Sequence, residues 1–92
     1  MILYKKYPLR FEEKDYEIRV LYQDTLINVA AFLNNHPVSG LRHQAMIPKA
    51  FDIKAILERG ADKELVEMSK KDIVEKRWEK FLKIMHDSKK TG

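Results

Sequence analysis

The sequence predicts a single α+β domain, in which a small antiparallel sheet of three or four strands from the N-terminal half packs against two or three C-terminal helices. Three observations favour this class. The 92 residues are the length of one domain. Before Pro48, apolar residues alternate with polar ones, as in strands, and after it they recur every three or four residues, as in helices. We assign the domain to residues 1–88 and a flexible tail to residues 89–92.

The clearest strand is expected over residues 16–22, "YEIRVLY", where aromatic and β-branched residues alternate with Glu17 and Arg19. The N-terminal segments "ILY" and "LRF" are expected to add one more short strand, broken near Pro8 because proline has no backbone N–H to donate. The polar pair "QD", which follows the strand expected over residues 16–22, suits a tight turn. An antiparallel pairing of neighbouring strands is therefore predicted.

The next segment, residues 25–33 or "TLINVAAFL", fits the helical spacing and the strand spacing equally well. We favour a strand, because the segment is short, follows a turn and ends in "NNHPVSG". A further strand is expected over residues 41–47, which Pro48 ends. The stretch between these two strands then forms a hairpin connection. Apolar side chains on both sides of residues 25–33 indicate a strand that needs cover on both faces.

Helices are predicted beyond Pro48. Asp52 is a good N-cap for "IKAILER", and Gly60 stands where a helix often ends with a left-handed residue. Asp62 is expected to cap the short helix "KELVEM" in the same way. Cap residues at positions 52, 60 and 62 predict two short helices joined by a turn.

The last helix is expected over about residues 70–87, because Ser69 followed by Asp72 resembles a capping box. One side of this helix carries an apolar stripe, and the others carry Lys, Arg and Glu. The stripe is first of all predicted to be core, and the alternative is that part of it, with Ile73 and Ile84 beside it, seals a subunit interface. The apolar stripe consists of Val74, Trp78, Phe81, Leu82 and Met85.

The net charge of +4 is concentrated at the C-terminal end. From Ser69 onward there are eight basic residues against four acidic ones, whereas residues 1–40 carry five of each. A basic helix of this kind is one way to contact phosphates, although acidic residues interrupt it. The candidate nucleic-acid contacts are Lys70, Lys71, Lys76, Arg77, Lys80 and Lys83.

Two of the three histidines lie in the stretch 34–44, "NNHPVSGLRHQ". His36 falls in the predicted turn, and His43 falls on a strand beside apolar neighbours. The spacing of the histidines matches no zinc signature. Loops nevertheless carry ligand contacts more often than the scaffold does. The candidate ligand-binding residues are therefore Asn35, His36, Arg42, His43 and Gln44.

No motif in the chain specifies a reaction. The sequence has no cysteine, its three glycines are isolated, and its serines have turn or cap explanations. We predict no metal, no cofactor and no catalytic residue. An enzyme that uses His36 or His43 as acid or base is the third-ranked hypothesis.

The function predicted first is that of a binding or regulatory module that acts through protein–protein contacts, with another protein or a second copy of itself as partner. A nucleic-acid-binding accessory protein that uses the basic C-terminal helix is the alternative. The absence of cysteine and of any apolar run near 18 residues favours a cytoplasmic protein without a membrane span.

Overall fold

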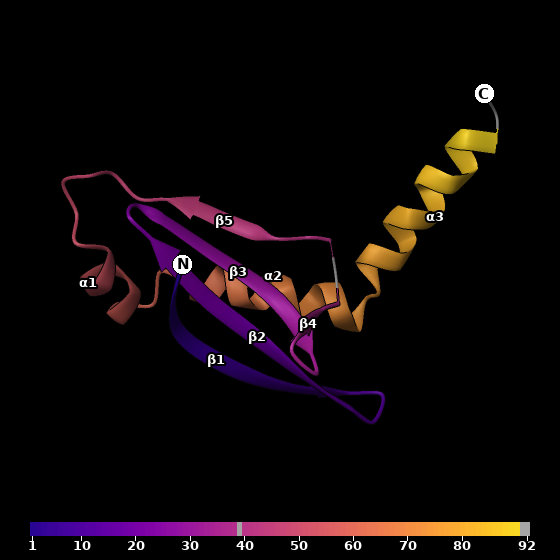
Figure 1. Cartoon of the computed structure of the whole chain (residues 1–92), viewed down its shortest axis with the longest axis horizontal. Helices are drawn as coiled ribbons and strands as arrows, with labels where there is room; N and C mark the ends of the chain where they lie inside the picture. The colour runs from indigo at the N-terminus through magenta and orange to yellow at the C-terminus, as the bar shows by residue number, and fades with distance from the viewer. Residues whose placement is uncertain (39, 91–92) are drawn as a thin grey trace.

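The structure is a computed structural model that describes residues 1–38 and 40–90. Five strands in the first half of the chain are followed by three helices, as the α+β prediction requires (Figure 1). The elements are β1 (Ile2–Phe11), β2 (Lys14–Gln23), β3 (Leu26–Leu33), β4 (His36–Pro37), β5 (His43–Met46), α1 (Ile53–Glu58), α2 (Lys63–Val74) and α3 (Arg77–Lys90).

The sheet is an antiparallel meander in the order β1–β2–β3, with β4 and β5 both paired to β3. β4 pairs with the end of β3 and β5 with its beginning, and β2 occupies the other edge of β3 along its whole length. β4 and β5 therefore act together as an interrupted fourth strand. The ambiguous segment 25–33 is a strand, as favoured from its context.

Two-residue turns join the first three strands and β4. In two of them both residues have left-handed backbone angles: φ is 49° and 65° at Glu12 and Glu13, and 51° and 64° at Asn34 and Asn35. Such turns match the twist of the strands that they connect. Asparagine tolerates this conformation well, whereas a longer side chain such as glutamate is strained there.

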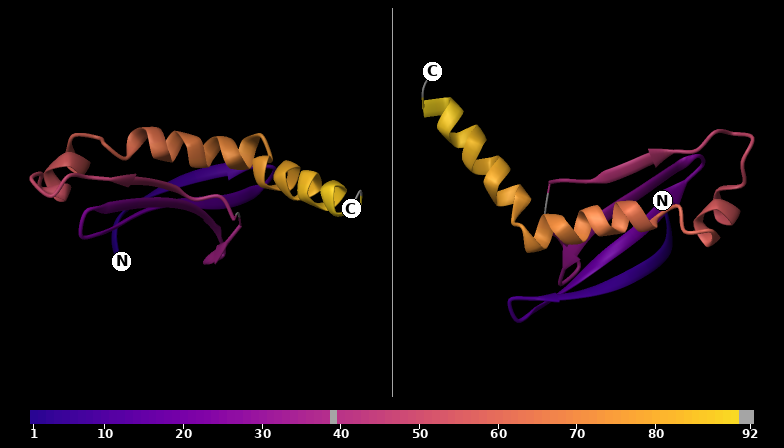
Figure 2. Two further views of the ribbon diagram at one scale, coloured as in Figure 1. Left: turned by 90° about the horizontal axis from the view of Figure 1, so that it is seen from above. Right: turned by 180° about the vertical axis from the view of Figure 1, so that it is seen from behind.

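The core lies between one face of the sheet and α2 (Figure 2). Ile18, Val20 and Tyr22 of β2 lie opposite Ala31, Val29 and Ile27 of β3, and all six are buried. Leu57 of α1 and Val66 of α2 complete the buried cluster. The opposite side of the sheet, which we call the open face, is covered by neither α2 nor α3.

Two predictions about the elements were wrong. β1 continues through Pro8, which pairs in register with Glu17, because an edge strand leaves one row of its N–H groups unused. The last helix does not begin after Ser69. α2 runs on through that residue, and the break falls at Lys76, whose φ is 53°.

The expected caps had different outcomes. Asp52 caps α1 as predicted, since its carboxylate accepts a hydrogen bond from the Lys54 backbone N–H at 3.1 Å. Gly60 has the expected positive φ of 92°. Asp62 stands at the start of α2 but makes no side-chain cap bond. Its backbone is already helical, with φ of −82° and ψ of −16°, and its carboxylate accepts a hydrogen bond from a tyrosine of β1.

α3 runs to Lys90, so the last two residues of the expected tail lie outside the described part of the chain. None of the described helices is both long and apolar enough to cross a membrane. α3 leads away from the sheet, with its C-terminal end far from the β-strands (Figure 1). This direction leaves most of the helix outside the folded body.

Candidate interaction site

The five predicted ligand-binding residues do not form one site. Adjacent strand residues point to opposite faces, so His43 points toward α2 and Gln44 points to the open face. His36 is exposed at the start of β4, and Arg42 is exposed ahead of β5. The structure therefore divides the predicted cluster between two faces.

Gln44 and Asn35 each accept or donate one hydrogen bond in two separate groups of polar side chains. Gln44 donates from Nε2 to Oδ1 of Asn28 at 3.1 Å, and Arg19 donates to Oδ1 of Asn35 at 2.6 Å. The Arg19 guanidinium also lies 4.2 Å from the centre of the Phe32 ring. Its hydrogen bond to Glu17 holds the pKa of that carboxyl below its usual range. Each of these polar side chains thus forms a hydrogen bond with a neighbouring side chain.

His43 forms the closest polar contact between the sheet and α2. Its Nε2 lies 2.6 Å from Oδ2 of Asp72, and the Asp72 side chain is only 3% exposed. Because a carboxylate only accepts hydrogen bonds, the imidazole nitrogen donates. The pair ties β5 to the last turn of α2.

The remaining polar atoms of this junction are incompletely satisfied. Oδ1 of Asp72 has no hydrogen-bond partner among the described residues, and neither has Oγ of Ser69 one turn earlier. The nearest cation to Oδ1 is the Arg77 guanidinium at 3.8 Å, which is an ion-pair distance and too long for a hydrogen bond. Asp72 is thus a buried carboxylate held mainly by His43.

Trp78 packs against Gly40, which lies between β4 and β5. A Cβ atom added at Gly40 would overlap the indole ring, so only glycine allows this close approach. The indole also stacks on Phe81, with ring centroids 5.6 Å apart. A small cavity of about 50 Å³ remains beside it, lined by Val38, Asp72, Ile73, Lys76, Trp78 and Glu79.

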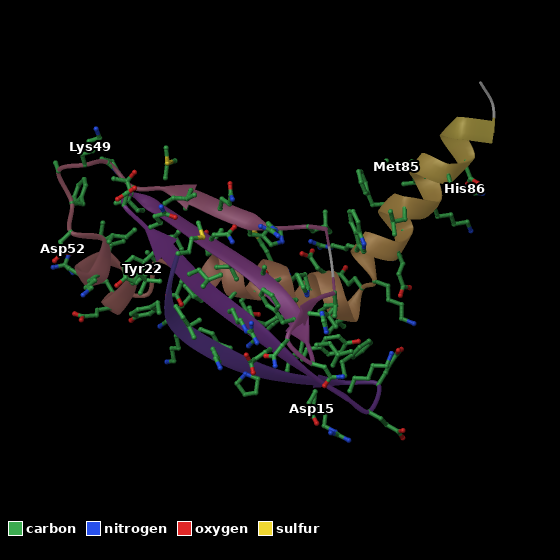
Figure 3. The ribbon with its side chains drawn as sticks, viewed as in Figure 1. Asp15, Tyr22, Lys49, Asp52, Met85 and His86 are labelled. Atoms are coloured by element: carbon green, nitrogen blue, oxygen red, sulfur yellow. The ribbon has the colours of Figure 1, made fainter. Side chains whose placement is uncertain are left out.

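Beyond Trp78 the apolar stripe is not core, contrary to the first expectation. Phe81, Leu82 and Met85 are each 45% exposed, and Val74 is 48% exposed. Of all the elements, only α2 lies close to α3. Figure 3 shows Met85 and His86 on α3, away from the sheet. The helix is amphipathic as predicted, but no described strand covers its apolar side.

Half of the predicted nucleic-acid contacts are neutralised within the chain. Lys70 pairs with Glu67 at 3.6 Å, Lys76 with Glu12 at 3.3 Å, and Arg77 with Glu75 at 3.1 Å. The other three cations have no ion pair among the described residues. They are Lys71, Lys80 and Lys83.

Sequence reasoning missed the pair His43–Asp72 and the role of Gly40. The sequence predicts Asp72 as the partner of a Ser69 cap, three residues on, whereas its partner in the structure lies 29 positions away. Gly40 was interpreted as a turn residue. No local pattern marks either contact, although a carboxylate on the core side of an amphipathic helix is a signal that could have been followed.

A second buried carboxylate ties β1 to α2. The Tyr7 hydroxyl donates to Oδ2 of Asp62 at 3.0 Å, and Asp62 is 1% exposed. Burial, together with this hydrogen bond, raises the pKa of the Tyr7 hydroxyl from its ordinary 10.0 to about 12.

We expect Tyr7→Phe to lower the free energy of unfolding by about 1–3 kcal/mol at neutral pH, because Asp62 loses its donor. The contribution of a raised tyrosine pKa is fully present below pH 10 and is lost as the pH rises through about 12. The difference between the two proteins should therefore shrink over that interval in urea titrations. A difference that stays constant up to about pH 12 would contradict the assignment.

Among the described residues, no three histidine, aspartate or glutamate side chains converge to hold a metal ion. Comparisons with protein-family models, with curated proteins and with solved structures gave no match. The most unusual feature of the described chain is α3, which leads away from the sheet with an exposed apolar stripe.

Proposed function

We propose that this protein is a binding module without chemistry of its own, which associates with a second copy of itself through α3. The observation that carries the proposal is the exposed apolar stripe on a helix that no strand contacts. An isolated helix of this length is only marginally stable in water, so α3 requires a packing partner. Among the described residues, α3 packs only on α2 and, through Trp78, on Gly40.

A second copy is favoured by the spacing of the stripe. Its four members on α3 are Trp78, Phe81, Leu82 and Met85, and their intervals read the same in both directions. An antiparallel copy, related by a two-fold axis between residues 81 and 82, would therefore place apolar residues on apolar residues. A symmetric dimer needs this kind of self-complementary patch.

The charges beside the stripe agree with this arrangement. In the antiparallel pair, Glu79 of each helix lies beside residues 83–86 of the other, which include Lys83 and His86. Opposite charges would thus meet on that flank of the dimer. Such rim contacts contribute little affinity, but they favour one orientation over the other.

The two other predicted functions have less support. Three of the six candidate phosphate contacts are held in ion pairs, which weakens the case for nucleic-acid binding. His43 is engaged by Asp72, and His36 has no acidic or nucleophilic partner among the described residues. Both functions remain predictions that the proposed dimer does not require.

The test is the molar mass of the protein in solution. We expect the wild type to pass from monomer to dimer between about 1 and 500 µM in sedimentation equilibrium. Leu82→Glu should abolish the dimer, because it places a carboxylate in the apolar contact. Lys80→Gln is the matched control, since it makes the same change in charge on the polar side of α3 and should leave the dimer intact.

Three results would overturn the proposal. The first is a wild type that stays monomeric at the highest concentration. The second is equal association of the wild type and Leu82→Glu. The third is loss of the dimer in the Lys80→Gln control, which would assign association to charge rather than to the stripe.

A further inference from the structure

A groove between β1 and α2 has a composition different from that of the α3 stripe. Its volume is about 420 Å³. Tyr7 and Val66 provide apolar surface, and four charged side chains surround them. These are Lys5 from β1 and Lys63, Glu67 and Lys70 from α2.

The groove carries an excess of positive charge. Three lysines face a single glutamate, and Glu67 is already paired with Lys70 at 3.6 Å. Lys5 is held by the π-face of Tyr7, with its Nζ 4.9 Å from the ring centre. The hydroxyl of the same tyrosine shields the buried Asp62 carboxylate from the groove. An anionic group is therefore the complementary ligand.

The free edge of β1 lies beside this groove. β1 is the outermost strand, and no other described strand pairs with its outer edge. The strand has a register irregularity between Leu3 and Lys5 and is regular from Lys5 to Phe11, where Pro8 is the only residue without a backbone N–H. An unpaired edge of this kind can accept an additional strand.

We propose that this edge and groove bind an extended acidic peptide segment of another protein. The segment adds to β1 as a further strand and places a carboxylate between Lys5 and Lys63. The combination favours a peptide over nucleic acid, because a free strand edge pairs with another peptide backbone and not with a phosphodiester chain. This site is independent of α3 and does not depend on self-association.

The experiment is an amide-resolved NMR titration of the labelled full-length protein. The probe is an acetylated and amidated heptapeptide in which glutamate alternates with valine, and the control peptide has glutamine in place of glutamate. We expect shifts along β1 and the first turns of α2, and slower hydrogen exchange at amides of β1. The glutamine peptide should bind at least about fivefold more weakly, because the charged contacts are lost.

Variants identify the side chains that bind the peptide. Lys63→Gln should weaken binding of the acidic peptide by about fivefold, whereas Lys80→Gln on α3 should leave it unchanged. The proposal fails if both variants behave alike or if the shifts lie on the open face. It also fails if a short single-stranded oligonucleotide gives the same shifts on β1 and α2, which would make the groove a phosphate site. Absence of any shift at millimolar peptide would overturn it as well.

Discussion

Replacing His43 with alanine is expected to lower the free energy of unfolding by about 2–3 kcal/mol. The imidazole is the only hydrogen-bond donor to the Asp72 side chain among the described residues, and this side chain is 3% exposed. Removing the donor leaves a buried carboxylate with only the Arg77 guanidinium at 3.8 Å. For a small domain with a total stability near 5–15 kcal/mol, this loss is a large fraction.

Urea unfolding followed by circular dichroism measures the effect. Asp72→Asn introduced into the His43→Ala protein should recover part of the loss, because it removes the uncompensated charge. His36→Ala is the control, since that histidine is exposed, and its effect should stay within about 0.5 kcal/mol. If the double variant is no more stable than His43→Ala, the cost does not arise from the buried charge.

Replacing Gly40 with alanine is expected to displace the Trp78 indole. The added methyl group would occupy the space of the ring, and overpacking of this kind costs about 1–3 kcal/mol. Because Trp78 is the only tryptophan, its fluorescence reports the movement directly. We expect fluorescence emission at longer wavelength and weaker self-association, since Trp78 at the start of α3 no longer packs on Gly40.

A smaller side chain at position 78 provides the control for this prediction. In a Trp78→Leu background there is more room for a Cβ at Gly40, so the same substitution should cost clearly less in thermal unfolding. An equal cost in both backgrounds would show that Gly40 is required for a backbone reason. Unchanged fluorescence in the single variant would contradict the steric argument.

The longer strands were predictable because their signal is local. Alternation marks β2, and the turn residues Asn34 and Asn35 mark the end of β3. The two-residue strand β4 was not predicted, since His36 and Pro37 fall in the stretch that was expected to be a turn. The break between α2 and α3 was not predictable, since it falls at Lys76 without a glycine or proline to mark it. The Ser69 cap pattern instead lies within a continuous helix.

The candidate site was less predictable than the fold. Spacing within a helix shows which residues share a face, but it does not show which surface covers that face. The same pattern that predicted a core position for Trp78 also predicted one for Met85, which is 45% exposed. Contacts such as His43 with Asp72 depend on how β5 and α2 pack, and no local rule gives that.

The direction of α3 is set near its first turn by three features: the left-handed backbone of Lys76, the ion pair of Lys76 with Glu12, and the packing of Trp78 on Gly40. Fourteen residues at 1.5 Å each make a lever of about 21 Å. A rotation of about 10° at its base therefore moves the far end by about 4 Å, roughly two thirds of the rise of one helical turn. Small dihedral changes at a single residue thus decide which surfaces the end of the helix can reach.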